Sequence, residues 1–335
     1  MQREGKTRDE DDQVAGLSAS FRKHACVDTV DDDVEASAES KDDLEGQWRQ
    51  IDIREVEVGE QIGGGGFAIV YEGFWKGKQV ALKTLFDPRA DAAVKKEFMD
   101  ELFVMSKLKH PNIVEMFGAC TRAPRFCMVL ELCESSLFHI LHNSREELRE
   151  KQLLGMQIEL ASAMEYLHAQ VPAVIHRDIK SHNVLVSEGY HVKLCDFGLV
   201  STSVTAAGTP AYMAPELLQS GLFSRKVDVY AFAVLMWEMY TRAIPFASWE
   251  PSDVRKFVAE GKRLGLPHSG YPKQCGQLIE RCWASEPDRR PEFKNITRAL
   301  TRIYSTIRDV SHLDEVSGGG DGDAFDLLER NVSKK

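Results

Sequence analysis

The segments HRDIKSHN, residues 176–183, and CDFG, residues 195–198, constrain this chain more than any other feature. Residues 184–186, directly after the first segment, are apolar and partly β-branched, which predicts a strand. A turn at the mouth of a strand exposes polar side chains where a ligand can reach them. The two segments therefore predict neighbouring loops that present polar groups to a bound molecule.

Three side chains in these loops suit phosphoryl transfer. That reaction needs a carboxylate near the acceptor hydroxyl and divalent cations that neutralise the phosphate oxygens. Asp178 would accept or orient the hydroxyl proton, whereas Asn183 and Asp196 would hold Mg²⁺, which prefers hard oxygen ligands. In these motifs the chain resembles the eukaryotic protein kinase superfamily. The resemblance implies ATP and Mg²⁺, with Mn²⁺ as an alternative metal, and it supplies the residue roles that follow.

A glycine-rich segment, IGGGGFAIVYEG at 62–73, lies between two stretches that alternation and β-branching predict to be strands. Glycines allow the backbone to approach nucleotide phosphates because no Cβ stands in the way. Glycine clusters more often mark plain turns, so it is the resemblance that gives Ile62, Gly63 and Gly65 a nucleotide-binding role. Ala68 replaces the third glycine of the family motif, which should still permit nucleotide binding.

A lysine and a glutamate upstream of the loops complete the expected nucleotide site. Lys83 ends VALK on the predicted third strand, where the family's lysine contacts the α and β phosphates. Glu101 lies in residues 92–108, whose apolar side chains recur at helical spacing, nine residues before His110. In this register the resemblance pairs Glu101 with Lys83. Without it, each would read as an ordinary exposed charge.

The adenine pocket is also inferred from the resemblance. Such a pocket is mostly apolar with few polar groups, and each of its residues could otherwise belong to the plain core. The expected residues are Leu130 as gatekeeper, Glu131, Leu132 and Cys133 as hinge, and Val70, Ala81 and Leu185 around the purine. Cys195 would sit at the back of this pocket, where it could be alkylated.

Downstream motifs extend the resemblance. GTPAYMAPE, residues 208–216, would close an activation loop, and its Glu216 would form a buried ion pair with Arg290. Residues 228–239, DVYAFAVLMWEM, predict a helix that is apolar on nearly all sides and therefore buried in the core. Asp228 at its start would accept hydrogen bonds from the loop at 176–183, because a buried carboxylate needs partners.

We therefore expect an α+β, two-lobed protein kinase fold. A small lobe with five antiparallel strands and one helix, together with the hinge, would span residues 48–132. A large, mainly α-helical lobe would span residues 133–308. Residues 1–47 are predicted to be an acidic disordered tail and residues 309–335 a flexible tail, because charge runs and glycine clusters disfavour a packed core.

The acceptor specificity is inferred from two residues. Lys180, two positions after Asp178, matches serine/threonine kinases, whereas tyrosine kinases carry alanine and arginine in this stretch, and Thr209 agrees. Residues 48–63, 110–120 and 282–293 are similar to the tyrosine-kinase-like group, which includes Raf, mixed-lineage and plant Raf-like kinases.

These features predict a serine/threonine protein kinase, phosphorylating proteins in intracellular signalling. A dual-specificity or tyrosine kinase and a nucleotide-binding pseudokinase scaffold remain as alternatives. The presence of all five catalytic and phosphate-binding residues argues against the scaffold: they are Lys83, Glu101, Asp178, Asn183 and Asp196.

Regulation is expected at the loop that follows Asp196. A buried guanidinium needs a partner, and Arg177 stands next to the catalytic Asp178. Phosphate on a hydroxyl of that loop would add about −1.5 to −2 charges. The candidates are Ser201, Thr202, Ser203 and Thr205, which could equally be plain solvated hydroxyls.

Composition narrows the partners. Residues 1–50 hold 14 acidic and 7 basic side chains of a chain whose net charge is −10. This balance disfavours nucleic acid, which requires a basic face. There is no long apolar run or leader that would predict a membrane span or export. The seven cysteines lack CxxC spacing, so reduced thiols and a cytoplasmic, or alternatively nuclear, location are expected.

Overall fold

The structure is a computed structural model. It describes residues 48–64, 68–85, 92–122, 126–200, 208–221 and 223–307. All of these belong to one compact unit, Glu45–Lys335. The segments predicted as tails, 1–47 and 309–335, lie outside the described residues, as do Gly65 and residues 201–207.

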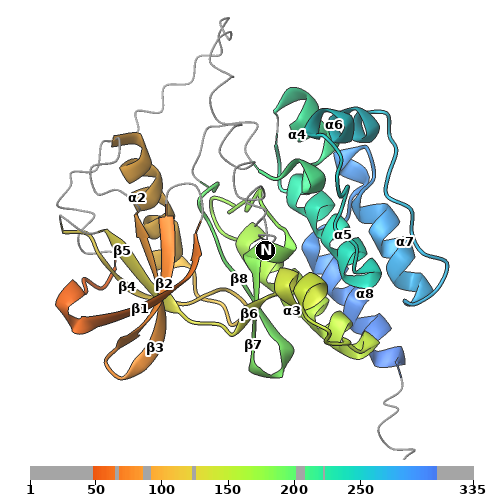
Figure 1. Ribbon diagram of the computed structural model, residues 1–335. Helices are drawn as coiled ribbons and strands as arrows, with labels where there is room; N and C mark the ends of the chain where they lie inside the picture. The colour runs from red at the N-terminus through yellow and green to blue at the C-terminus, as the bar shows by residue number, and fades with distance from the viewer. Residues whose placement is uncertain are drawn as a thin grey trace, which may run out of the picture. The chain divides into compact units, whose positions relative to one another are not determined.

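The first lobe is an antiparallel sheet with one long helix packed beside it (Figure 1). Its strands lie in the order β1-β2-β3-β5-β4. The elements are β1 (Val56–Gly64), β2 (Ala68–Trp75), β3 (Lys78–Leu85), α2 (Ala92–Lys107), β4 (Met116–Cys120) and β5 (Cys127–Glu131). In α2, Phe98, Leu102 and Met105 are buried at helical spacing, and Glu101 is buried on the same face. The predicted five strands and one helix are confirmed.

One feature of this lobe was not predicted. The chain at Gln50 and Ile51 runs parallel to β4, where Ile51 N donates to Ala119 O at 2.9 Å. Gly118 allows this approach, because a Cβ at that position would lie 2.4 Å from Arg49 O. Ile51 also joins the apolar cluster on this side of the sheet, which contains Trp75. The segment before β1 is thus part of the small lobe's core.

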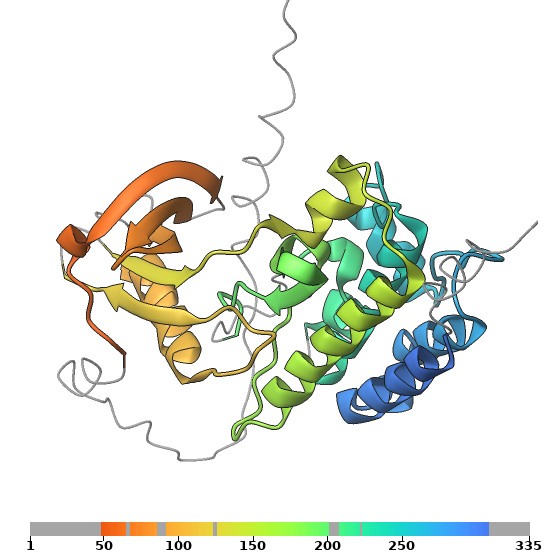
Figure 2. The same cartoon turned by 90° about the horizontal axis from the view of Figure 1, so that it is seen from below.

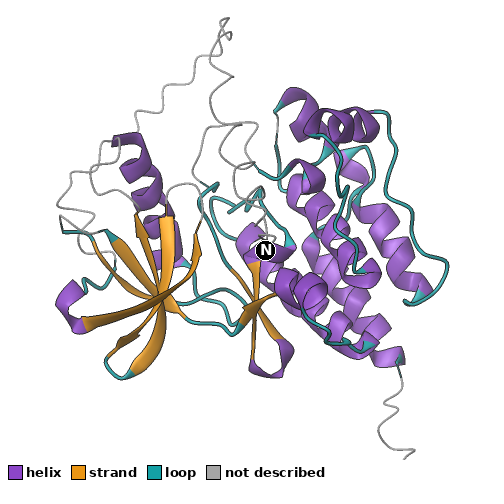
Figure 3. Cartoon of the chain, in the orientation of Figure 1, coloured by secondary structure: helices purple, strands orange, loops and turns teal. Residues whose placement is uncertain are grey.

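The second lobe is mainly helical (Figures 2 and 3). Helix α3 packs along α8, and α5 packs against α7. Its helices are α3 (Glu150–His168), α4 (Pro215–Ser220), α5 (Lys226–Thr241), α6 (Pro251–Ala259), α7 (Lys273–Cys282) and α8 (Phe293–Thr306). Every residue of α5 from Val227 to Met239 is buried, which confirms the predicted core helix. Within the described ranges, none of the helices combines the length and apolar character that crossing a bilayer needs.

A small sheet positions the two motif loops. It consists of β6 (Ser135–Ser136), β7 (Val184–Ser187) and β8 (His191–Leu194), in that order. The loop at 176–183 leads into β7, and β8 leads directly to Cys195 and Asp196. Because β7 and β8 pair, both loops open at the same end of the small sheet. Val114 N donates to Leu194 O, and Leu194 N donates to Asn112 O, which joins this sheet to the chain before β4.

Candidate active site

Asp228 organises the first motif loop. Its carboxylate is fully buried and accepts hydrogen bonds from His176 N at 2.9 Å and Arg177 N at 2.8 Å, as predicted. His168 Nε2, at 2.8 Å, is a third partner that sequence reasoning missed. These bonds hold a turn in which Arg177 has a φ of 69°, a left-handed conformation that is uncommon for a residue with a side chain. Hydrogen bonds to Asp228 of the core helix α5 thus hold the turn at His176 and Arg177 in place.

The two motif loops are tied to each other. His176 Nε2 lies 3.0 Å from Cys195 O, and the ring of His176 meets Phe197 edge-on at 5.1 Å. Cys195 N donates to Asn183 O at 3.0 Å. Asp196 also has a left-handed φ, 65°, directly after the extended backbone of β8 and Cys195. The loops predicted to be neighbours lie side by side.

Asp178 lies at the centre of a polar cluster that joins it to three other predicted site residues. Lys180 Nζ is 2.7 Å from Asp178 Oδ2 and donates to Thr209 Oγ1 at 2.9 Å. Thr209 donates to Asp178 Oδ1 through both its backbone N, at 3.2 Å, and its hydroxyl, at 3.1 Å. Asn183 Nδ2 donates to Asp178 Oδ2 at 2.9 Å. A carboxylate, an ammonium group and a hydroxyl therefore meet at one point.

Lys83 connects the two lobes. Its ammonium group is 2.6 Å from Glu101 Oε1, the predicted ion pair, and 3.2 Å from Asp196 Oδ1. Burial disfavours the charged form of Lys83, but the two carboxylates outweigh it and raise the pKa of Lys83 above its ordinary value. Burial disfavours the charged form of Asp196 as well and so raises its pKa, yet the charge and hydrogen bond of Lys83 dominate and lower the pKa of Asp196. Both groups are therefore charged at neutral pH.

The residues expected to hold a divalent cation have suitable donor groups. The amide nitrogen of Asn183 faces Asp178, which leaves its amide oxygen for another partner. Asp196 uses Oδ1 toward Lys83 and keeps a half-exposed carboxylate. Among the described residues, no group of three His, Cys, Asp or Glu side chains could hold a metal. Two oxygen donors suit a cation whose remaining ligands are water and nucleotide phosphates.

The predicted nucleotide residues fall on adjacent strands. Gly63 on β1 pairs with Val70 on β2, and Val70 pairs with Lys83 on β3. Ala81 lies opposite Leu130, and both are buried. The strands place the remaining residues as follows: Ile62 on β1, Glu131 at the end of β5, Cys133 just beyond it, and Leu185 on β7. Their contacts with adenine remain a prediction, and Gly65 lies outside the described residues.

Arg177 has partners other than a loop phosphate. Its guanidinium donates to Leu199 O at 3.1 Å and lies over the ring of Phe223, 4.3 Å from the centroid. Both contacts are with uncharged groups, so a loop phosphate as the counter-ion of Arg177 stays a prediction. Ser201, Thr202, Ser203 and Thr205 lie outside the described residues, so their regulatory role stays a prediction.

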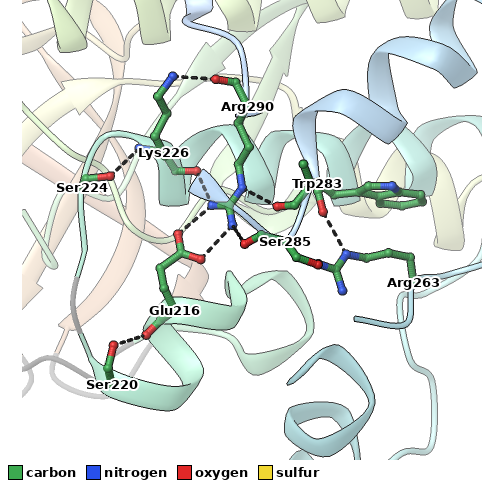
Figure 4. Close-up of polar contacts among 9 residues, drawn as sticks. Glu216, Ser220, Ser224, Lys226, Arg263, Trp283, Ser285 and Arg290 are labelled. Carbon is green, nitrogen blue, oxygen red and sulfur yellow. Dashed lines mark hydrogen bonds and ion pairs between the residues drawn. The ribbon is translucent and has the colours of Figure 1, made fainter. Parts of the chain in front are cut away.

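An ion pair behind the acceptor segment was predicted and is present (Figure 4). Arg290 donates to both carboxylate oxygens of Glu216, at 2.6 and 2.8 Å, in the bidentate geometry that favours arginine. It also donates to the backbone carbonyls of Ala284, Lys226 and Ser285, and its side chain is fully buried. This network anchors the start of α4, which follows directly from the segment that carries Thr209.

Glu238 is the main functional candidate that sequence reasoning missed. It is a fully buried charge in α5 and is bonded to Ser181 of the first motif loop and to Tyr212. The signal was present in the sequence, because Glu238 and Asp228 are both acidic residues in an otherwise apolar helix. A buried carboxylate in such a helix requires polar partners from elsewhere in the chain.

Comparisons with known proteins agree with this geometry. Residues 56–300 match the family described as protein tyrosine and serine/threonine kinase. Serine/threonine-protein kinase CTR1 of Arabidopsis thaliana is 41% identical over 276 residues, which are 79% of this chain and 33% of that protein.

Two further relatives have similar coverage. Probable serine/threonine-protein kinase drkA of Dictyostelium discoideum is 37% identical over 265 residues, 77% of this chain and 41% of that protein. Probable serine/threonine-protein kinase SIS8 of Arabidopsis thaliana is 37% identical over 262 residues, 76% of this chain and 25% of that protein. The family match spans both lobes and both motif loops. The chain therefore belongs to the protein tyrosine and serine/threonine kinase family, whose members use ATP, typically with a divalent cation, to phosphorylate proteins.

Proposed function

We propose that this chain is an ATP- and Mg²⁺-dependent kinase that phosphorylates serine and threonine hydroxyls of proteins in intracellular signalling. The observation that carries the proposal is the contact of Lys180 with both Asp178, at 2.7 Å, and Thr209, at 2.9 Å. Relatives named serine/threonine-protein kinases, at 35–41% identity, support it.

The cluster can activate a hydroxyl acceptor. The Asp178 carboxylate already accepts a hydrogen bond from one hydroxyl, that of Thr209, so it can accept one from a substrate. Lys180 places a positive charge beside that carboxylate, where negative charge develops on the transferred group. Because the cluster is assembled before substrate binds, little reorganisation is required during the reaction.

Residues of the nucleotide side would orient the phosphates. The charged Lys83, fixed by Glu101, would contact the α and β phosphates. Asn183 and Asp196 would hold Mg²⁺, which supplies charge neutralisation for the β- and γ-phosphate oxygens. The bond between Lys83 and Asp196 brings the phosphate-orienting and metal-binding groups within 3.2 Å of each other.

The relatives do not identify the proteins that this chain phosphorylates. The chain spans from a quarter to about two fifths of the length of the three relatives named above. The partners that follow from the site are ATP and proteins with serine or threonine acceptors. A cytoplasmic or nuclear location stays a prediction.

The test is incubation of the full chain with γ-labelled ATP and a degenerate peptide library, with Mg²⁺ and Mn²⁺ in parallel, followed by phosphoamino-acid analysis. We expect phosphoserine and phosphothreonine, with the higher rate in Mg²⁺. Phosphotyrosine as the main product would show a tyrosine kinase instead. Binding of ATP without transfer of phosphate, either to the peptides or to the chain itself, would favour the nucleotide-binding pseudokinase scaffold.

A further inference from the structure

Glu238 is a junction of three segments. Its fully buried carboxylate meets Ser181 Oγ at 2.7 Å, Tyr212 Oη at 2.7 Å and His142 Nε2 at 2.8 Å. A buried carboxylate needs such partners, because an unpaired charge is costly away from water. The carboxylate therefore sets the spacing between three parts of the chain that are far apart in sequence.

Two of these partners flank the acceptor site. Ser181 directly follows Lys180, and Tyr212 is the third residue after Thr209. Lys180 donates to the hydroxyl of Thr209 at 2.9 Å. Glu238 thus holds, on the core side, the two backbone segments whose side chains meet at that contact. A shift of the carboxylate would change the separation of the two segments.

The third partner comes from a rigid turn. His142 belongs to the π-helical turn η2 (His139–Asn143), a rare geometry that is often found at functional sites. Arg242, which directly follows α5, donates to two carbonyl groups of this turn at 2.8 and 3.1 Å. Phe138, just before the turn, stacks on His182 of the first motif loop with the ring centroids 3.8 Å apart. Arg242 and the stacking of Phe138 thus hold the turn beside the first motif loop.

His142 differs from the other two partners in its chemistry. Among the described residues, it is the one partner of Glu238 whose side chain can carry a positive charge. Its side chain is 8% exposed, so water cannot readily replace it. An ionised carboxylate only accepts, so with Glu238 ionised it is Nε2 of His142 that carries the hydrogen of this bond.

We propose that His142 is a positioning residue for the protein substrate, acting through Glu238 on Ser181 and Tyr212. The proposal rests on the proposed kinase function and deepens it. Among the described residues, the polar contact of His142 is with Glu238 and its ring contact is with Phe138, whereas Thr209 is bonded to Asp178 and Lys180. Loss of its N–H would leave the buried carboxylate short of one donor, so Glu238 would move away from Ser181 or Tyr212. Reaction with the peptide substrate would be impaired, whereas binding of ATP would not.

The experiment compares His142→Phe, which keeps a ring and removes the donor, with His142→Gln, which restores an N–H at a similar reach. Ile140→Val, a loss of one methyl group in the same turn, is the control for general loosening. Each folded variant is measured for kcat/KM with a serine/threonine peptide and for its Kd for ATP with Mg²⁺. We expect His142→Phe to lower kcat/KM for peptide about 10- to 100-fold, the range for losing a hydrogen bond to a charged group. ATP affinity should stay within about twofold of wild type, since the strands that carry Lys83 are unchanged.

The controls decide between positioning and mere packing. His142→Gln should recover most of the lost kcat/KM, and Ile140→Val should match wild type. Peptide kinetics of His142→Phe within twofold of wild type would overturn the proposal, as would equal losses in the Phe and Gln variants or in Ile140→Val. If His142→Phe does not fold, His142→Leu removes the same donor with a smaller apolar side chain and is compared with His142→Gln in the same way. A wild-type chain that phosphorylates no peptide would instead refute the proposed function.

Discussion

The polar side chains of the two lobes are held in different ways. In the large lobe, Asp228, Glu238 and Arg290 are fully buried, and each has at least three hydrogen-bond partners. On the nucleotide side, Lys83 has two carboxylate partners, and the side chain of one of them, Asp196, is 46% exposed. The acceptor site is thus built into the core, whereas the nucleotide site rests on a few contacts between separate elements.

This difference has a physical consequence. A buried network tolerates little movement, because any group that loses its partner pays the full desolvation cost. The contact of Lys83 with Glu101 depends instead on where α2 packs, and that of Lys83 with Asp196 on how the lobes meet. Loss of a polar partner in the large lobe should therefore appear as lost stability, and loss of a polar partner on the nucleotide side as lost activity at nearly constant stability.

The largest effect is expected from Arg290→Ala. The substitution leaves the largely buried Glu216 without its partner, so the free energy of unfolding should fall by about 3–5 kcal/mol. Denaturant unfolding measures it. Arg289→Ala is the matched control, because Arg289 is 74% exposed and pairs with the exposed Glu286, for which about 0–1 kcal/mol is expected. Equal losses in the two variants would contradict the distinction between the lobes.

Asp196→Asn should show the opposite behaviour. It keeps the volume of a half-exposed side chain but removes a charge that faces Lys83 and the expected metal. We expect kcat to fall by about 10²- to 10³-fold, as for loss of one preorganised charge-stabilising group, with the melting temperature close to wild type. Asp100→Asn makes the same change on the surface of α2 and should leave kcat unaltered. Turnover of the folded Asp196→Asn variant within tenfold of wild type would remove Asp196 from the metal site.

Much of this organisation could be predicted from the sequence. Alternating and helical periodicity indicated the five strands, α2 and α5, because each buries one face or all faces. The pairs Lys83–Glu101 and Glu216–Arg290 followed from the family register rather than from periodicity. The distances within these pairs could not be predicted, because the spacing of two residues along the chain does not say how close their side chains lie.

Other features depend on contacts between distant segments. The left-handed backbone of Arg177 is stabilised by Asp228, which is 51 residues away in sequence. The pairing of Gln50 with β4 depends on Gly118, because a Cβ at that position would block it. In the sequence, this glycine was noted only as part of the family motif at residues 110–120. The packing of Phe223 against the guanidinium of Arg177 was not predicted, because an exposed aromatic residue gives no local sign of such a contact. Local patterns do not encode such tertiary partners.

Leu130→Gly tests whether the nucleotide side can be reshaped without loss of activity. Leu130 is buried on β5 opposite Ala81, so its removal should open space beside the expected adenine position. The cost in stability is about 2–5 kcal/mol, as for other buried leucine truncations. We expect the variant to use bulky N6-substituted ATP analogues that the wild type rejects, as measured by transfer to peptide. Leu130→Met, which conserves volume, should still reject them. An active Leu130→Gly variant that refuses the analogues would place the hinge register elsewhere.

The smallest expected effect is a difference in alkylation rate between cysteines near the nucleotide site and cysteines in the core of the large lobe. Cys133 and Cys195, next to the hinge and to Asp196, are half-buried, whereas Cys275 and Cys282 in α7 are fully buried. Burial, together with the nearby Glu131, raises the pKa of Cys133 to about 11, and burial also raises the pKa of Cys195. Because the thiolate is the nucleophile, a raised pKa means slower alkylation at neutral pH.

The sign of the pH dependence follows from that shift. An ordinary thiol, with a pKa of about 8.5, stops gaining reactivity near pH 9, whereas Cys133 should gain about tenfold per pH unit until its own pKa of about 11 is approached. Iodoacetamide labelling from pH 7 to 10, followed by peptide mass spectrometry, measures both sites, with Cys133→Ser and Cys195→Ser to assign the signals and the denatured chain as reference.

Cys275 and Cys282 should label only when the chain unfolds, because they are fully buried between packed helices. If the rate at Cys133 levels off near pH 9, the thiol is not desolvated as the structure has it. If Cys282 labels in the native chain as fast as Cys133, the large lobe opens as readily as the nucleotide side, and the contrast between the two lobes does not hold.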